Sequence, residues 1–276
     1  MTTAPVTNPQ PRGAQRPRTI RFRIERCDGP GKPARWEAFD VPVEPGANVI
    51  SCLQWIAANP VTIEGKRTTP VVWDSGCLEE VCGACTMRVN GRVRQSCTAL
   101  IENLLAAGVT EVTLQPMSKF PVVRDLFVDR QRFFNDLKRA KAWVPIDGTY
   151  NLGAGPREKP ADQAERYVLS TCMTCGCCLD ACPQYKKEED AKEWDQSFVG
   201  AAVISQVRLF NEHPTGAALK PERLDFMASI GGVSDCGNAQ NCVKVCPKEI
   251  PLTESIAAIG RAVSIHRIKQ FFGVRD

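Results

Sequence analysis

The sequence has very few of the residues that most enzyme active sites need. It contains only two histidines, His213 and His266, so a histidine-based catalytic triad and a histidine-rich zinc site are nearly excluded. The first residues lack the apolar segment of a secretory signal, and no run reaches the roughly 18 apolar residues of a transmembrane helix. The net charge of +4 does not predict a nucleic-acid-binding face. We therefore expect a soluble chain on the cytoplasmic side of a membrane.

The residue that is unusually abundant is cysteine, which occurs fourteen times. Reducing compartments do not sustain many disulfides, so cysteines at this density indicate metal binding. The cysteines form three groups and two isolated residues, and the 74 residues between Cys97 and Cys172 contain none. This gap predicts two metal-binding domains joined by a cysteine-free segment.

Residues 1–18, rich in Pro, Gln, Arg and Thr, are predicted to form a disordered tail, and residues 19–120 a small α+β domain. Alternating apolar residues and turn signals predict five strands, and apolar residues at helical spacing predict one helix. The strands are expected over 19–27, 36–44 and 109–116 and as a hairpin across Asn90-Gly91 over 87–95, and the helix over 48–60. Five strands and one helix in about 100 residues favour a β-grasp.

The remaining chain is predicted to be mainly helical. Apolar periodicity and i,i+4 charge pairs over Val122–Val144 predict a connecting helix, and a Gly/Pro-rich loop follows at 147–160. Residues 121–160 are therefore expected to join the two domains. From 161 to 276 the pattern is helical and is interrupted by the cysteine groups.

The first cysteine group has the spacing of a plant-type ferredoxin. The run Cys77-x4-Cys82-x2-Cys85, with Cys97 beyond it, supplies four thiolates for the two irons of a [2Fe–2S] cluster. The small Gly-Ala pair inside the run leaves room for backbone amides to point at the sulfurs. The alternative is a zinc site, but an all-cysteine zinc site usually has two separated C-x2-C pairs, which the x4 gap fits poorly.

The second and third groups are two versions of the bacterial ferredoxin run C-x2-C-x2-C-x3-C-P. The second group matches it at every position, and the third is the same run with Ala239 in place of its second cysteine. The third group consists of Cys236, Cys242 and Cys246. The predicted fold is therefore α+β: an N-terminal β-grasp plant-type ferredoxin domain followed by an α-helical bacterial-ferredoxin-like domain.

In two-cluster ferredoxins the fourth cysteine of one run ligates the other cluster, and this exchange predicts two different clusters here. A [4Fe–4S] cluster takes Cys172, Cys175, Cys178 and Cys246. The other site has only Cys182, Cys236 and Cys242, which predicts a [3Fe–4S] cluster. The alternative is a decayed run with an empty or labile site. Cys27, Cys52 and Cys177 are expected to be buried spectators.

Three clusters of different type can form an electron relay. The sequence has no G-x-G-x-x-G flavin fingerprint and no acid–base constellation, so electrons must enter from one partner and leave to another. The three runs in this order strongly resemble the iron–sulfur subunit of succinate dehydrogenase and fumarate reductase, over about residues 19–273. The phrases CLEEVCGACT and CGNAQNCVKVCPKEIPLT resemble the bacterial branch with a single diheme membrane anchor, whose quinone is usually menaquinone.

The resemblance implies a role in succinate:quinone oxidoreductase and the tricarboxylic acid cycle. A flavoprotein subunit with covalently bound FAD would oxidise succinate to fumarate. Electrons would pass through [2Fe–2S], [4Fe–4S] and [3Fe–4S] to quinone at a membrane anchor that carries heme b. The chain would be a peripheral subunit at the cytoplasmic face of the bacterial cell membrane, with no nucleic-acid partner.

The sequence departs from family members that use ubiquinone. Those members carry a Trp pair shortly after the first Cys-Pro and a His after the first cysteine of the last run. Here the corresponding residues are Lys186, Lys187 and Gly237, which favours menaquinone. Pro183, Lys186 and Gly237 are predicted to lie near the quinone. Lys186 and Lys187 are also expected to face the membrane anchor or lipid headgroups, and the alternative is a solvated basic pair.

Two other functions fit parts of the pattern. The chain could be a three-cluster relay subunit of another membrane oxidoreductase, although such subunits often lack the plant-type domain or have other spacings. It could also be a zinc-stabilised interaction module with no redox role. A zinc protein would be colourless and an iron–sulfur protein brown, and the identity of a co-purifying flavoprotein would separate the two redox functions.

Overall fold

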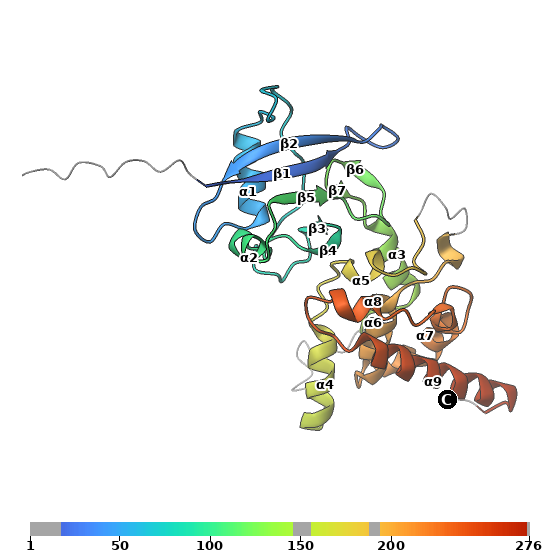
Figure 1. Cartoon of the computed structure of the whole chain (residues 1–276). Helices are drawn as coiled ribbons and strands as arrows, with labels where there is room; N and C mark the ends of the chain where they lie inside the picture. Colours follow the sequence, from blue (N-terminus) through green and yellow to red (C-terminus); the bar gives the residue numbers. More distant parts are fainter. Residues whose placement is uncertain (1–17, 146–155, 188–193, 275–276) are drawn as a thin grey trace, which may run out of the picture.

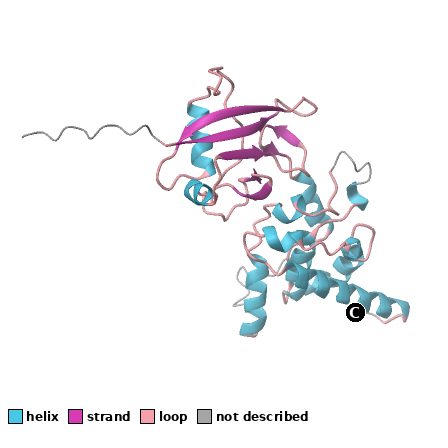
Figure 2. Ribbon diagram, in the orientation of Figure 1, coloured by secondary structure: helices cyan, strands magenta, loops and turns pink. Residues whose placement is uncertain are grey.

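The computed structural model describes residues 18–145, 156–187 and 194–274. The tail predicted at 1–18 lies outside these residues, apart from Arg18. Figure 1 shows a half that carries a sheet and a half built from helices, lying next to each other in chain order. In Figure 2 the strands are confined to the first of these halves. The α+β class predicted from the sequence is confirmed.

The first half is a β-grasp, as predicted. Its strand order is β2-β1-β5-β3-β4, in which β1 and β5 are parallel and the other paired neighbours are antiparallel. Along β1, Ile20, Phe22 and Ile24 are buried in alternation with exposed or half-buried residues. The strands are β1 (Thr19–Arg26), β2 (Arg35–Pro42), β3 (Thr86–Val89), β4 (Arg92–Gln95) and β5 (Glu111–Gln115).

Two helices pack with this sheet. Helix α1 (Val49–Ala58) begins at Asn48, whose side chain accepts a hydrogen bond from the Ser51 N–H at 2.9 Å, and it buries Leu53 and other apolar residues in the core. Helix α2 (Ile101–Ala106) was not among the predicted elements. Its six residues are too few to show a helical period in the sequence.

The single helix predicted over Val122–Val144 is wrong in its first part. A hairpin of β6 (Val122–Arg124) and β7 (Phe127–Val128) comes first, and α3 (Gln131–Arg139) follows. Asp125 fixes the hairpin turn, because its buried carboxylate accepts hydrogen bonds from Arg26 Nε at 2.9 Å and from two backbone N–H groups. These bonds tie the segment to the β-grasp, and such tertiary contacts override local helical preference.

The second half is helical, as predicted. Helix α6 is buried along most of its length and packs against α4, α7 and α9. Part of the loop predicted at 147–160 lies outside the described residues. No helix in the described ranges has the length and apolar character that a bilayer crossing requires. The elements are α4 (Pro160–Ser170), α5 (Cys177–Asp180), α6 (Ala201–Glu212), α7 (Lys220–Met227), α8 (Asn241–Val245) and α9 (Leu252–Phe271), with 3₁₀ turns at Trp194–Gln196, Gly216–Leu219 and Val233–Asp235.

The two halves meet where β4 faces α5 and α8 (Figure 1). Arg92 on β4 donates a hydrogen bond to the carbonyl of Lys244 on α8 at 3.0 Å. At the end of α5, Asp180 accepts hydrogen bonds from the Ser118 hydroxyl and the Lys119 N–H. This interface brings the first cysteine loop against the second.

Candidate iron–sulfur cluster sites

The first cysteine loop directs backbone N–H groups at the sulfur of Cys77, a half-buried residue. The N–H groups of Glu79, Val81 and Cys82 lie 3.3 Å from Cys77 Sγ. Hydrogen bonds from these groups, that of Glu79 above all, lower the pKa of Cys77 to about 7. The thiolate is the form that binds iron, so this sulfur is partly prepared for ligation at neutral pH.

Of the other three cysteines, Cys82 is exposed on the loop, whereas Cys85 and Cys97 are buried at the base of a hairpin. Cys85 directly precedes β3 and Cys97 follows β4, so strand pairing brings them together, and the Ser96 N–H donates to the Cys85 carbonyl at 3.2 Å. Burial, with the nearby Cys97 thiol, raises the pKa of Cys85 to about 12. A thiol of this kind ionises at neutral pH only when a bound cation offsets its desolvation, which fits an iron ligand.

Five cysteines line one small cavity in the helical half: the four expected ligands Cys172, Cys175, Cys178 and Cys246, which come from both bacterial-type runs, and Cys177. Apolar residues such as Ile250 and Leu252 form much of the remaining wall. Burial raises the pKa of Cys172 to about 11 and also raises the pKa of Cys178 and Cys246. Soft sulfur donors in an apolar cavity fit an iron–sulfur cluster, whose positive irons stabilise the thiolates.

A second small cavity in this half is lined by Cys182, Cys236 and Cys242. Cys182 comes from the first bacterial-type run and the other two from the second, so the fold exchanges one cysteine in each direction. Ala239 lines the same cavity, where a complete run would place a sulfur. Within the described residues, no group of three or more His, Cys, Asp or Glu side chains is arranged to hold a single metal ion. The thiols of the helical half line the two small cavities instead.

Arg130, which precedes α3, joins the first and second cysteine loops. Its Nη1 donates a hydrogen bond to the Gly83 carbonyl at 2.8 Å and lies 3.5 Å from the Cys175 carbonyl oxygen. Its Nη2 lies 3.5 Å from a carboxylate oxygen of Asp74. Sequence reasoning missed Arg130, because it stands 47 and 45 residues from the two loops and belongs to no motif.

The three residues predicted to lie near the quinone are only partly brought together. Pro183 and Gly237 line the small cavity of Cys182, Cys236 and Cys242, whereas Lys186 does not belong to its wall. The Lys186 carbonyl instead accepts a hydrogen bond from Arg132 at 2.8 Å. A Cβ added at Gly237 would overlap the side-chain amide of Gln184, so Gln184 fills the space that a larger residue would need.

The three cysteines outside the ligand runs have different surroundings. Cys52 is buried in the β-grasp core, as predicted, and burial raises its pKa to about 11. The prediction that Cys27 is buried is wrong: it is half-buried at the end of β1, where its thiol donates to the Gly29 carbonyl at 3.1 Å. Cys177 is fully buried, and its sulfur lies 3.7 Å from Gln95 Nε2.

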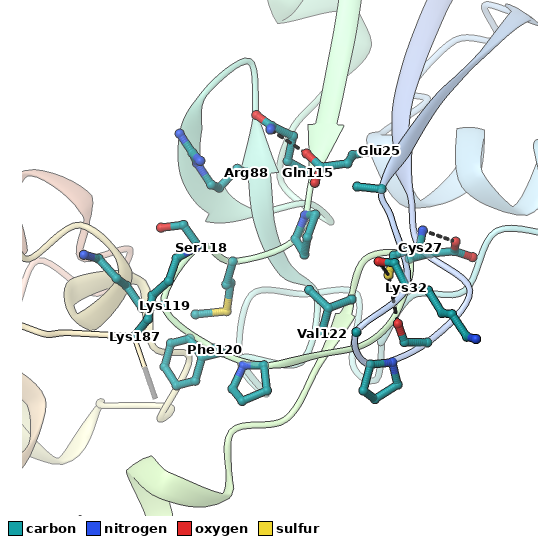
Figure 3. Close-up of a pocket in the computed structure, with 18 of the residues that line it drawn as sticks. Glu25, Cys27, Lys32, Arg88, Gln115, Ser118, Lys119, Phe120, Val122 and Lys187 are labelled. Carbon is teal, nitrogen blue, oxygen red and sulfur yellow. Dashed lines mark hydrogen bonds between the residues drawn. The ribbon is translucent and has the colours of Figure 1, made fainter. Parts of the chain in front are cut away.

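A wider cavity of about 770 Å³ lies elsewhere at the junction of the halves (Figure 3). Four cationic residues, Lys32, Arg88, Lys119 and Lys187, contribute to its lining. Its one cysteine is Cys27. This cavity therefore lacks the ligand set of a cluster, and the thiol-lined sites are the two small cavities and the first loop.

Known proteins show the same organisation. Residues 21–135 match the family model described as a 2Fe-2S iron-sulfur cluster binding domain, and residues 168–250 match that of a 4Fe-4S dicluster domain. The succinate dehydrogenase iron–sulfur subunit of Bacillus subtilis strain 168 is 53% identical over 256 residues, covering 93% of this chain and 97% of the relative. The chain belongs to the iron–sulfur subunits of succinate dehydrogenase and fumarate reductase.

More distant relatives agree with this membership. The fumarate reductase iron–sulfur subunit of Wolinella succinogenes is 31% identical over 191 residues, which are 68% of this chain and 76% of the relative. A chain of the Mycobacterium smegmatis Sdh1 complex in the apo form shares the fold, with a TM-score of 0.74 and 21% identity over 91% of this chain and 97% of that one.

Family membership fixes the role and the cofactors. The protein is an electron-transfer subunit of succinate dehydrogenase or fumarate reductase that carries [2Fe–2S], [4Fe–4S] and [3Fe–4S] clusters. This result contradicts both the zinc-stabilised module and the relay subunit of an unrelated oxidoreductase.

Proposed function

We propose that eleven cysteines hold the three clusters in an exchanged arrangement. The two thiol-lined cavities carry this proposal, because each takes cysteines from both bacterial-type runs. The β-grasp unit with its hairpin at 122–128 holds the first cluster, and the helical unit from residue 161 holds the other two. The ligands are Cys77, Cys82, Cys85 and Cys97 for [2Fe–2S], Cys172, Cys175, Cys178 and Cys246 for [4Fe–4S], and Cys182, Cys236 and Cys242 for [3Fe–4S].

When bound, the clusters supply three one-electron carriers in series. The chain's own residues hold these sites close together and dry. Arg130 binds the backbone of the first two cysteine loops. Apolar residues on α6 and α9 form part of the wall of both small cavities, and Ala201 and Ile256 do so at the cavity of Cys182, Cys236 and Cys242. Burial and hydrogen bonds to sulfur are levers that set the potential of such clusters.

The subunit connects a flavoprotein to a membrane anchor. An FAD-containing subunit exchanges electrons with succinate and fumarate at one end, and an anchor with heme b holds quinone at the other. The quinone is menaquinone: Gln184 occupies the space beside Gly237 in which ubiquinone-type members carry a histidine. This part of the proposal also rests on the resemblance to the diheme-anchor branch.

The exposed end of α9 faces the anchor at the cytoplasmic face of the membrane. Ile268, Phe271 and Phe272 expose 58%, 83% and 72% of their surface. From Ser255 to Val274 the chain has basic residues and no acidic one. An apolar stripe in a basic setting suits contact with a membrane protein surrounded by anionic lipid headgroups.

Purification under anaerobic conditions from membranes tests this proposal. The complex should contain a flavoprotein, a heme-bearing anchor and menaquinone, and the chain should hold about nine irons. EPR of the oxidised protein should show [3Fe–4S], and reduction should add the [2Fe–2S] signal. About four irons per chain would contradict the three-cluster assignment, and ubiquinone in the complex would contradict the quinone.

A further inference from the structure

Gln95, at the end of β4, lies between the first and second cysteine loops. Its side chain is buried, and its Oε1 lies 3.3 Å from Cys85 Sγ. Its Nε2 lies 2.6 Å from the Thr86 hydroxyl oxygen and 3.7 Å from Cys177 Sγ. A buried amide therefore touches both a ligand of the first cluster and the cysteine that the ligand runs leave unassigned.

Cys177 extends this contact to the second loop. It is the first residue of α5, it is fully buried, and it lines the same small cavity as Cys175. Gln95 donates in turn to Cys177, although the two residues are 82 positions apart. Hydrogen bonds thus connect Cys85, Gln95 and Cys177, and Cys177 reaches the wall of the cavity that Cys175 also lines.

We propose that Gln95 and Cys177 are positioning residues that hydrogen-bond the ligand sulfurs of Cys85 and Cys175 and so bridge the first two cluster sites. The inference rests on the ligand assignment proposed above. A ligand sulfur carries no proton and can only accept, so the Gln95 amide turns by half a rotation when Cys85 binds iron. Nε2 then donates to Cys85 in place of Cys177. The Cys177 thiol stays packed against the amide and directs its one proton at the sulfur of Cys175.

The surroundings of Gln95 permit this rotation. With the amide turned, Oε1 faces the Thr86 hydroxyl, which can donate to it. That hydroxyl donates to the Gly83 carbonyl at 2.9 Å in the present arrangement. The Gly83 carbonyl keeps a donor in either case, because Arg130 lies 2.8 Å away. No buried polar group is therefore left without a partner by the change.

The bridge has a measurable consequence. Hydrogen bonds to cluster sulfurs stabilise the more negative reduced form and raise the reduction potential. Removing the Gln95 donor should lower the midpoint potential of [2Fe–2S], and removing the Cys177 donor should lower that of [4Fe–4S]. A purely structural role would change stability and leave both potentials in place.

The first test is Gln95→Leu in the complete purified complex, with redox titration followed by EPR. The [2Fe–2S] midpoint potential should fall while the iron content is unchanged. Gln115→Leu is a matched control in the same sheet, since Gln115 Nε2 donates to Glu25 at 2.7 Å and touches no ligand. An unchanged [2Fe–2S] potential in Gln95→Leu would overturn the bridge.

The second test uses Cys177 and also decides the matter if Gln95→Leu fails to hold its cluster. Cys177→Ala should lower the [4Fe–4S] potential, Cys177→Ser should restore it by supplying a donor, and Cys52→Ala should leave it unchanged. If the [4Fe–4S] signal is present in the Cys177 variants and its midpoint potential is unchanged, the bridge is overturned but the ligand assignment stands. If the unsubstituted protein lacks the [2Fe–2S] or [4Fe–4S] signal, the ligand assignment fails as well.

Discussion

Gly83 lies directly against the carbonyl oxygen of Met173. A Cβ built on Gly83 would be 2.5 Å from that oxygen and 2.9 Å from the Cα of Cys175. The φ of Gly83 is 73°, a left-handed conformation that glycine adopts without strain. The first and second cysteine loops therefore touch through their backbones, and Arg130 binds a carbonyl of each. Such close approach suits a relay between neighbouring one-electron carriers.

Gly83→Ala should disrupt this contact. The new methyl group meets backbone atoms, which cannot move aside cheaply, so we expect a loss of about 1–3 kcal/mol in the free energy of unfolding beyond that of the control. The control is Gly91→Ala: Gly91 has a φ of 76°, and its added Cβ would have no neighbour within 4 Å. Thermal unfolding of the cluster-loaded proteins compares the two. Equal destabilisation would mean that the contact contributes nothing.

The exchanged ligation predicts a reciprocal pair of losses. Cys182→Ala should damage the [3Fe–4S] site, although Cys182 belongs to the run that otherwise serves [4Fe–4S]. Cys246→Ala should damage [4Fe–4S] for the converse reason. EPR of oxidised and reduced samples distinguishes the clusters, and the [2Fe–2S] signal, lost in Cys85→Ala, should survive both changes. Loss of [4Fe–4S] alone in Cys182→Ala would show that the ligands are not exchanged.

The pKa values of the thiols at the first two cluster sites predict how they react after the iron has been removed by a chelator. Hydrogen bonds lower the pKa of Cys77 to about 7, so its thiolate fraction falls as the pH drops through that value. Burial raises the pKa of Cys85 to about 12 and that of Cys172 to about 11. Iodoacetamide should therefore modify Cys77 at neutral pH, more slowly as the pH is lowered, and spare the other two. Peptide mass spectrometry measures this, and comparable rates at Cys77 and Cys85 would refute it.

The ligand runs and the β-grasp could be predicted because their signals are local. The Asn90-Gly91 turn marks its hairpin, and the cysteine spacings mark the cluster sites within short windows of sequence. The hairpin at 122–128 could not be predicted in this way. Its turn depends on Asp125 bonding to Arg26, which is 99 positions away. Local periodicity favoured a helix there, but the hydrogen bond from the distant Arg26 stabilises a turn instead.

The junction residues were missed for the same reason. Gln95 reads only as the last residue of a strand, and Arg130 as one cation among many. Each gains its role from loops that lie far away in the chain. Cys177 carried a weak signal, since it stands inside a ligand run but out of register. Its burial against Gln95 turns an expected spectator into a candidate bridge.

The end of α9 yields a prediction about membrane attachment. The double variant Phe271→Glu with Phe272→Glu should release the subunit from isolated membranes, because two charges would face the anchor in place of an apolar pair. The three clusters should remain, since these side chains line neither thiol cavity. Tyr167→Glu on α4, where the side chain is 65% exposed, is the control and should stay bound. Sedimentation of membranes with immunoblotting distinguishes the outcomes, and full retention of the double variant would contradict the proposed contact.

Ala239 offers the sharpest test of the third cluster, since its methyl group lines the cavity of Cys182, Cys236 and Cys242. Ala239→Cys supplies the thiolate that a complete run has at this position, so we expect [3Fe–4S] to become [4Fe–4S]. The oxidised variant should lose its [3Fe–4S] EPR signal and gain about one iron per chain.

The exchange of cluster type should separate two activities. The added iron and thiolate should lower the potential of the last carrier, so quinone reduction should fall while succinate oxidation with an artificial acceptor is largely kept. That pattern is expected because the flavoprotein contact and the first cluster are unchanged. Ala239→Val is the matched control, since it adds bulk without a ligand and should gain no iron. If Ala239→Cys keeps its full [3Fe–4S] signal and the original rate of quinone reduction, then Ala239 only packs against the loop and the missing corner of the cluster lies elsewhere.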